Sequence, residues 1–143
     1  MMREVAPIMI RQKWGRIVNI SSGAAHSGAC GRANYAASKS GIEILTITAA
    51  KELSEYGITV NVIRPGFTVT PMTAGRGYDF DALAKGIPRQ RIGTPKDVVR
   101  VINFLVKEES DYITGQIISV DGGLSITGRG LINELTLLKA KGI

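Results

Sequence analysis

RIVNIS (residues 16–21) is a short run rich in β-branched residues, and it opens into a loop of small residues at positions 23–31. This pattern predicts a buried β-strand with a loop at its carboxyl end. Two further runs of the same kind follow, ITVNVI at 58–63 and QIISV at 116–120. The first ends at a Pro-Gly pair and the second at an Asp-Gly-Gly turn, neither of which continues a central strand. Three buried strands are therefore expected.

Two helical segments separate the predicted strands. The longer spans residues 34–56 and ends before Gly57, a residue type that favours helix C-termini. Its apolar residues fall at helical spacing, at Ala37, Leu45, Ala49 and Leu53. The other follows Thr94, with a proline next and Asp97 three residues on, which is the arrangement of a capped helix start. Its core-facing positions are predicted at Val98, Val101, Ile102 and Leu105.

The alternation of strands and helices determines the predicted fold class. Parallel neighbours in a sheet need a crossover, and helices of this length supply it, so we expect an α/β protein with a parallel sheet. Ligands of such sheets lie beyond the carboxyl ends of the strands. Residues 71–92, with several glycines and only a short helical stretch at 79–85, are predicted to form a mobile lid there. The loop at 23–32 would form the opposite wall.

The composition is that of an ordinary soluble domain. The 143 residues are 44% hydrophobic and 21% charged, and no apolar run is long enough to cross a bilayer. The first residues carry charges where a signal peptide needs an apolar stretch, so the cytoplasm is the expected compartment and no membrane partner is expected. Cys30 is the single cysteine, which excludes an internal disulfide. His26 is the only histidine and has no second ligand candidate at a useful spacing, so no metal site is expected.

The net charge of +6 raises the question of an anionic partner. The basic residues form short scattered clusters without interleaved aromatic residues, and this distribution disfavours nucleic-acid binding. A phosphate-bearing cofactor or acyl carrier is compatible with the charge.

Tyr35 and Lys39 lie four residues apart near the start of the longer predicted helix, so their side chains are expected on one face of it. The ammonium of Lys39 and the positive end of the helix dipole both stabilise a phenolate, which would let Tyr35 exchange a proton near neutral pH. Exposed tyrosine–lysine pairs on helices are also common without any catalytic role. The pair alone is therefore weak evidence for catalysis, and the neighbouring motifs decide its interpretation.

The order of the surrounding motifs is more specific than the pair alone. The motifs are SS at 21–22, NYAASK at 34–39, NVIRPG at 61–66 and VDGG at 120–123. With them the chain resembles the short-chain dehydrogenase/reductase family over most of its length, and within it the 3-oxoacyl-(acyl carrier protein) reductase group. The resemblance implies a partial Rossmann-like doubly wound parallel sheet, made of the last three strands with their helices.

The resemblance also implies an activity, in which a hydride passes between NAD(P) and a carbonyl carbon while Tyr35 acts as the general acid in reduction. Lys39 would tune the tyrosine and bind the nicotinamide ribose, and the hydroxyl of Ser22 would bind the substrate oxygen. For Ser21 we expect a strand-end hydroxyl bonded to backbone. The implied cofactor is NADP or NAD, with NADP preferred. The implied substrate is a small-molecule or acyl-carrier-bound carbonyl compound, and the implied assembly is a dimer or tetramer.

The family's cofactor loop corresponds to the segment after the second predicted strand. Pro65 and Gly66 would pass along the nicotinamide, with the glycine allowing close approach of the backbone. Thr68 would bind the carboxamide through backbone groups. The hydroxyl of Thr70 would approach the cofactor, although a plain turn explains this residue equally well. The predicted cofactor contacts are Tyr35, Lys39, Pro65, Gly66, Thr68 and Thr70.

Two polar residues in or next to the strands are expected to be structural. Asn61 stands mid-strand between apolar residues, where an amide needs hydrogen-bond partners. Asp121 precedes two glycines at a strand end and is expected to fix the loop.

The chain departs from the family at its start. Members begin with a strand and a glycine-rich turn that holds the adenosine pyrophosphate, and these residues contain no G-x-G-x-x-G motif. Residues 3–13 would be the tail of a helix, without the asparagine that completes the family's catalytic set. We therefore expect that the amino-terminal dinucleotide-binding half is absent. The alternative to an enzyme is a non-catalytic truncated or split subunit that oligomerises but binds no dinucleotide.

The expected domain organisation follows from this departure. Residues 1–124 are predicted to be the carboxyl-terminal portion of one Rossmann-like domain, and residues 125–143 an extension beyond it. Leucines at helical spacing, at Leu131, Leu135 and Leu138, indicate a short amphipathic helix in that extension.

Overall fold

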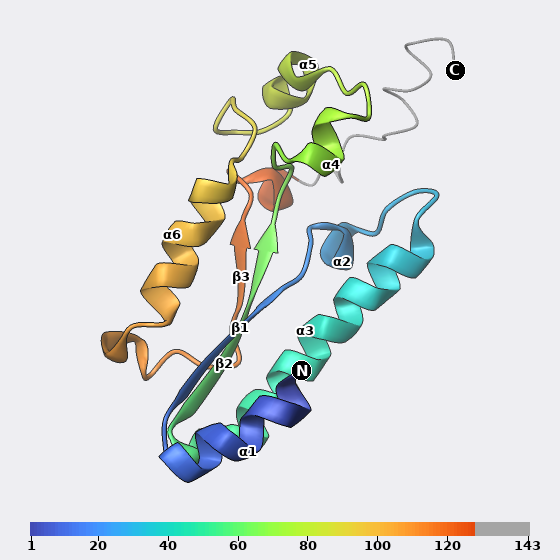
Figure 1. Cartoon of the computed structure of the whole chain (residues 1–143). Helices are drawn as coiled ribbons and strands as arrows, with labels where there is room; N and C mark the ends of the chain where they lie inside the picture. Colours follow the sequence, from blue (N-terminus) through green and yellow to red (C-terminus); the bar gives the residue numbers. More distant parts are fainter. Residues whose placement is uncertain (128–143) are drawn as a thin grey trace.

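The computed structural model describes residues 1–127 (Figure 1). Its helices are α1 (Met2–Gln12), α2 (Ala24–Ser27), α3 (Ala33–Leu53), α4 (Pro71–Ala74), α5 (Phe80–Lys85) and α6 (Pro95–Leu105). Its strands are β1 (Gly15–Ile20), β2 (Ile58–Pro65) and β3 (Ile117–Val120). Three short 3-10 helices lie at Ser54–Tyr56, Glu108–Ser110 and Leu124–Thr127. The fold class is α/β, and all three predicted strands are present.

The strands form the predicted parallel sheet. Their order is β1-β2-β3, so β2 is the central strand of the described part. The register aligns Ile20 with Ile63, and Ile63 with Ile118. Residues 58–63 of β2 are all buried, as in a strand covered on both faces. Because the register brings the carboxyl ends of the strands together, the loops that follow them meet at one edge of the sheet.

Helices cover both faces of this sheet. Figure 1 shows α1 and α3 on one side of the strands and α6 on the other. The main core lies between β1, β2 and α3 and consists of Ile17, Ala49, Ala50, Leu53, Ile58 and Val60, with apolar residues of α1 packed against it. On the other face Leu105 of α6 is fully buried. The predicted start of α6 is confirmed, since Thr94 and Asp97 form a capping box.

The buried face of α3 differs from the prediction. Ala49 and Leu53 are buried as expected, but Ala37 is exposed and Leu45 is 52% exposed. Polar residues occupy part of the inward face instead: Glu43 is 6% exposed and Thr46 is 0% exposed. The apolar spacing predicted the wrong face for Leu45 because the middle of this helix has polar residues on its inward side. Hydrogen bonds from other elements satisfy these polar groups, from Asn19 to Thr46 and from Ser21 and Arg64 to Glu43.

Two short helices were not expected, α2 and α4. The Thr70–Pro71 pair that begins α4 repeats the Thr94–Pro95 start of α6, and it was the available signal for α4. The extension predicted from residue 125 is described only to Thr127, so the predicted leucine helix lies outside the described residues. Across residues 1–127, we find no helix with the length and apolar character needed to span a membrane.

Candidate active site

A cavity of about 490 Å³ opens at the carboxyl ends of the strands. Its wall is built from the loop after β1, the first turns of α3, the loop after β2 and the turn after β3, as the parallel topology predicts. The predicted site residues that line it are Ser22, Tyr35, Lys39, Pro65, Gly66, Thr68 and Thr70. The structure thus brings together every residue that the sequence proposed for catalysis or cofactor contact.

Tyr35 and Lys39 lie in the first two turns of α3. The Nζ of Lys39 is 5.8 Å from the centre of the Tyr35 ring, and the guanidinium carbon of Arg32 is 5.7 Å from it. Both cations are therefore within cation–π range of the same ring. Lys39 Nζ also donates a 3.0 Å hydrogen bond to the backbone carbonyl of Ile20, which ties the start of α3 to the end of β1.

The two serines after β1 have different surroundings. Ser22 lines the cavity, and its Oγ accepts a 3.3 Å hydrogen bond from the N–H of Ala24. Ser21 is only 3% exposed, and its hydroxyl donates to Glu43 Oε1 at 2.8 Å and lies 3.2 Å from the carbonyl oxygen of Lys39. The predicted backbone partner of Ser21 is confirmed. The carboxylate of Glu43 is a second partner that was not predicted.

The structure gives a reason for glycine at position 66 in addition to the predicted approach to the nicotinamide. A Cβ at this position would lie 2.6 Å from the Cβ and 2.7 Å from the Cα of Asp121. The turn after β3 therefore approaches the Gly66 backbone so closely that only glycine fits, independently of any bound cofactor. Thr68 follows on the cavity wall, and its hydroxyl donates a 3.1 Å hydrogen bond to the carbonyl of Gly66.

Thr70 serves as the N-cap of α4. Its Oγ1 accepts a 3.4 Å hydrogen bond from the N–H of Thr73, and its own N–H donates to Thr73 Oγ1 at 2.8 Å. The side chain of Thr70 thus has a structural role, in line with the turn explanation, while the residue also lines the cavity.

The segment predicted as a lid packs through aromatic side chains. The ring of Phe67 lies edge-on to Tyr78 at 5.0 Å and to Phe80 at 6.3 Å between centroids. The predicted helical stretch at 79–85 is confirmed as α5, and Asp79 caps it by accepting a 3.0 Å hydrogen bond from the N–H of Ala82. Tyr78 lines the cavity, so this segment forms part of the wall.

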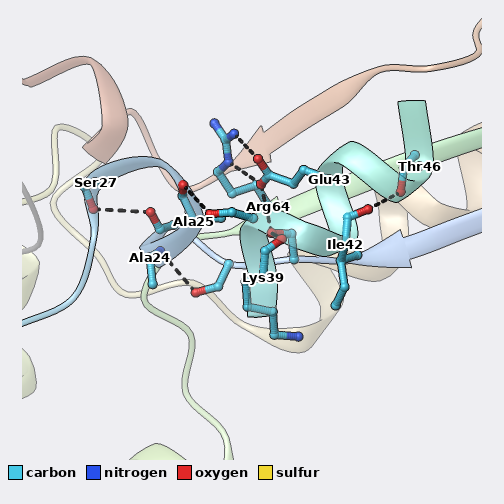
Figure 2. Close-up of polar contacts among 12 residues, drawn as sticks. Ala24, Ala25, Ser27, Lys39, Ile42, Glu43, Thr46 and Arg64 are labelled. Carbon is cyan, nitrogen blue, oxygen red and sulfur yellow. Dashed lines mark hydrogen bonds and ion pairs between the residues drawn. The ribbon is translucent and has the colours of Figure 1, made fainter. Parts of the chain in front are cut away.

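A buried ion pair lies behind the predicted catalytic residues (Figure 2). Arg64 donates through Nε and Nη2 to the two carboxylate oxygens of Glu43, at 2.8 and 2.7 Å. Their side chains are 13% and 7% exposed. Burial raises the pKa of Glu43, but hydrogen bonds from Arg64 and Ser21 outweigh burial and hold this pKa below its ordinary value. The hydrogen bond to Glu43 raises the pKa of Arg64.

Sequence reasoning missed this pair, although a signal for it existed. Glu43 lies four residues after Lys39 on α3, and Arg64 immediately precedes Pro65. A glutamate one helical turn beyond a motif residue projects from the same face, where it needs a partner if that face is buried.

Asn61 and Asp121 have the structural roles predicted for them. Asn61 is fully buried; its Nδ2 donates to the carbonyl of Ile113 at 2.7 Å, and its Oδ1 accepts from the N–H of Gln116 at 3.0 Å. Asp121 accepts 2.9 Å hydrogen bonds from the backbone N–H groups two and four positions later. Burial raises the pKa of Asp121, but hydrogen bonds from the side chain and backbone of Ser125 and from the backbone of Gly123 outweigh burial and leave this pKa below its ordinary value.

The structure also shows where the only histidine and the only cysteine of the sequence lie. His26 lies on α2 and lines the cavity. Cys30 is exposed. In the part of the chain that the structure describes, no group of three or more His, Cys, Asp or Glu side chains could hold a metal ion.

Comparison with known proteins gives the family. Residues 1–125 match the family profile described as enoyl-(acyl carrier protein) reductase, which is a short-chain dehydrogenase/reductase profile. The chain belongs to the short-chain dehydrogenase/reductase family. The predicted resemblance and the Rossmann-like fold class are thereby confirmed.

Individual members of the family are similar over the same region. The 3-oxoacyl-(acyl-carrier-protein) reductase FabG of Thermotoga maritima is 48% identical over 123 residues, which cover 85% of this chain and 50% of that protein. The solved 3-oxoacyl-(acyl-carrier protein) reductase of Brucella melitensis superposes with a TM-score of 0.79 at 39% identity, over 87% of this chain and 47% of that one. The structure described as ElxO with NADP bound has a TM-score of 0.80 at 33% identity, over 86% of this chain and 51% of that one. This short-chain dehydrogenase/reductase chain spans about half the length of the relatives it matches.

Proposed function

We propose that the protein is an NAD(P)-dependent oxidoreductase that reduces the keto group of a 3-oxoacyl compound, with Tyr35, Lys39 and Ser22 as its reaction centre. The observation that carries the proposal is that these three residues line one cavity together with Pro65 and Gly66. The similarity to curated 3-oxoacyl-(acyl-carrier-protein) reductases supports the substrate class.

Each residue of the centre has a distinct role in the proposed reaction. When bound, the nicotinamide supplies the hydride that reduces the carbonyl carbon. Tyr35 donates the proton to the carbonyl oxygen as a general acid. The hydroxyl of Ser22 hydrogen-bonds the same oxygen as negative charge develops on it. Lys39 orients the phenol and offers its ammonium to the ribose hydroxyls, for which it would leave the carbonyl of Ile20.

The residues present fit the nicotinamide end of the cofactor. A cavity of about 490 Å³ is within the range of small-molecule sites, and polar groups of Ser22, Lys39 and Thr68 lie on its wall beside Pro65 and other apolar residues. NADP is the first candidate because a family neighbour is described with NADP bound. The glycine-rich turn for the pyrophosphate has no counterpart in these residues.

We further propose that the protein assembles as a homodimer or homotetramer through α3. Ile44 and Leu45 on this helix are 64% and 52% exposed, and their side chains form an adjacent apolar pair on its outer surface. Burial of such residues in a symmetric interface would remove them from water.

The test is reduction of an acetoacetyl thioester with NADPH by the purified protein that carries this sequence, measured by cofactor absorbance, with a crotonyl thioester assayed in parallel. The proposal predicts turnover of the acetoacetyl compound alone. Reduction of only the crotonyl compound would point to enoyl reduction, the activity in the description of the family profile. A titration of NADPH fluorescence addresses the alternative, since a chain that forms oligomers but binds no NADPH and reduces neither compound would be the non-catalytic subunit.

A further inference from the structure

Three elements meet in one buried polar cluster directly behind the cavity. The cluster consists of Ser21 at the end of β1, Glu43 on α3 and Arg64 on β2. Figure 2 shows the side chains of Glu43 and Arg64 facing one another beside the helix that carries Lys39. Because its members come from three elements, the cluster links the end of β1, α3 and β2 through side chains.

Each member of the cluster lies close in the chain to a residue of the cavity wall. Ser21 precedes Ser22 and also lies 3.2 Å from the carbonyl oxygen of Lys39. Glu43 is one helical turn beyond Lys39, and Arg64 precedes the Pro-Gly pair of the cavity wall. A displacement of the cluster would therefore change the spacing between the serine and the lysine.

The backbone of the same region is tied to the cluster as well. The N–H of Ser21 donates a 2.8 Å hydrogen bond to the carbonyl of Ile63 on β2. Lys39 Nζ donates to the carbonyl of Ile20 at 3.0 Å. The end of β1 is thus held from β2 on one side and from α3 on the other.

Stability alone does not account for a charge pair at this position. Removing two charges from water costs about as much as their attraction returns, so apolar residues of similar volume often give equal stability. An ion pair with hydrogen bonds fixes distances and directions that apolar contacts leave free, because it needs defined geometry.

We propose that the Ser21–Glu43–Arg64 cluster is a positioning device that holds the start of α3 against the end of β1, and so sets the placement of Lys39 relative to Ser22. Its kinetic consequence rests on the function proposed above. Its structural consequence, the hydrogen bond from Lys39 Nζ to Ile20, does not.

The test replaces both charges with apolar residues of similar volume, in the double variant Glu43→Leu/Arg64→Met. Carbonyl ¹³C resonances report hydrogen bonds, and the carbonyl of Ile20 is not touched by either substitution. We expect the variant to unfold near the wild-type denaturant midpoint, while the Ile20 carbonyl resonance moves upfield. We expect kcat to fall about 10- to 100-fold with KM within a factor of about two, as for a misplaced catalytic group.

Two further variants complete the test. Ser21→Ala removes only the hydroxyl, so it should fold even if the double variant does not, and it should show the same upfield shift at Ile20 and the same loss in kcat. Ser110→Ala is the matched control, because Ser110 is 1% exposed and its hydroxyl donates to Phe104 outside the cavity wall. It should lower the unfolding midpoint without moving the Ile20 resonance or kcat.

The outcomes separate this inference from the proposed function. A folded double variant with an unshifted Ile20 carbonyl overturns the positioning role, and so does wild-type kcat in both cluster variants. Absence of turnover in the wild type contradicts the proposed function, and the carbonyl resonance then still decides the positioning role.

Discussion

Gly66→Ala is the substitution for which the structure gives the most direct prediction. The added Cβ would lie 2.6 Å from the Cβ and 2.7 Å from the Cα of Asp121. Asp121 directly follows β3, whose Val120 pairs with Pro65, and the N–H of Arg89 donates a 3.2 Å hydrogen bond to the carbonyl of Gly122. The turn after β3 therefore cannot move away from Gly66 without straining these contacts. The Gly66 N–H also donates to the carbonyl of Val120 at 3.0 Å, so a shift of either loop strains that bond.

The expected loss of stability in Gly66→Ala has two sources, the overpacking against Asp121 and the strain on the hydrogen bond between Gly66 and Val120. Overpacking usually costs about 1–3 kcal/mol, and contact with backbone atoms belongs at the upper end of that range. We therefore expect Gly66→Ala to lower the free energy of unfolding by about 3 kcal/mol. The strain lies on the cavity wall, so NADPH affinity should fall as well if the cofactor passes this loop.

Gly41→Ala provides the matched control. Gly41 lies within α3, and a Cβ there would meet no atom within 4 Å. Alanine is about 1 kcal/mol more favourable than glycine inside a helix, so this variant should be slightly more stable than the wild type. Urea unfolding followed by circular dichroism measures both variants. Equal unfolding free energies for Gly66→Ala and the wild type would refute the close contact with Asp121 as the reason for glycine.

Three other predictions concern distant parts of the chain. Asn61→Leu should cost about 2–5 kcal/mol in a urea titration, because two backbone groups lose their buried partner; a cost near zero would show that water or a relaxed backbone replaces the amide. Asp97→Asn should lower stability at pH 7, because hydrogen bonds from Arg91 and the Thr94 backbone hold the pKa of Asp97 well below its ordinary range. Because the pKa of Asp97 is lower in the folded state, its carboxylate stabilises the fold above the unfolded pKa of about 4, and this stability is lost as pH falls below that value. The difference in unfolding free energy between Asp97→Asn and the wild type should therefore shrink only below about pH 4. A difference that stays constant down to pH 3 contradicts this assignment. Leu45→Arg should shift the protein toward monomer in light scattering, and an unchanged mass would place the interface elsewhere.

The sequence predicted much of the fold and most of the cavity wall. Its β-branched runs fixed the three strands, and the Thr-Pro start of α6 fixed that helix, because these signals are local. Tyr35, Lys39 and Ser22 were predicted from motif order, and the parallel topology brings them to one edge of the sheet. These features depend on neighbours in the chain or on topology, both of which a sequence pattern contains.

Other features depend on contacts between distant segments and were missed or, for the face of α3 that carries Leu45, predicted wrongly. The outward placement of Leu45 and the inward placement of Glu43 follow from the ion pair with Arg64, which lies 21 residues further along the chain. The close approach of Asp121 to the Gly66 backbone is a second reason for glycine at this position, and it was not predicted. The helical spacing of Glu43 from Lys39 indicates which face of the helix carries Glu43, but no sequence pattern identifies Arg64 as its partner or Asp121 as the neighbour of Gly66.

The most direct test of the central claim is isotope transfer from NADPH deuterated at the transferring position of the nicotinamide ring. The protein carrying this sequence and its Tyr35→Phe variant are incubated with an acetoacetyl thioester, and the 3-hydroxyacyl product is analysed by mass spectrometry. We predict deuterium at the former carbonyl carbon for the wild type, with a rate about 100-fold or more lower for Tyr35→Phe and NADPH affinity nearly unchanged. Product without deuterium, or a Tyr35→Phe variant that retains most of the rate, would contradict the claim that this cavity is a carbonyl-reducing centre with Tyr35 as its proton donor.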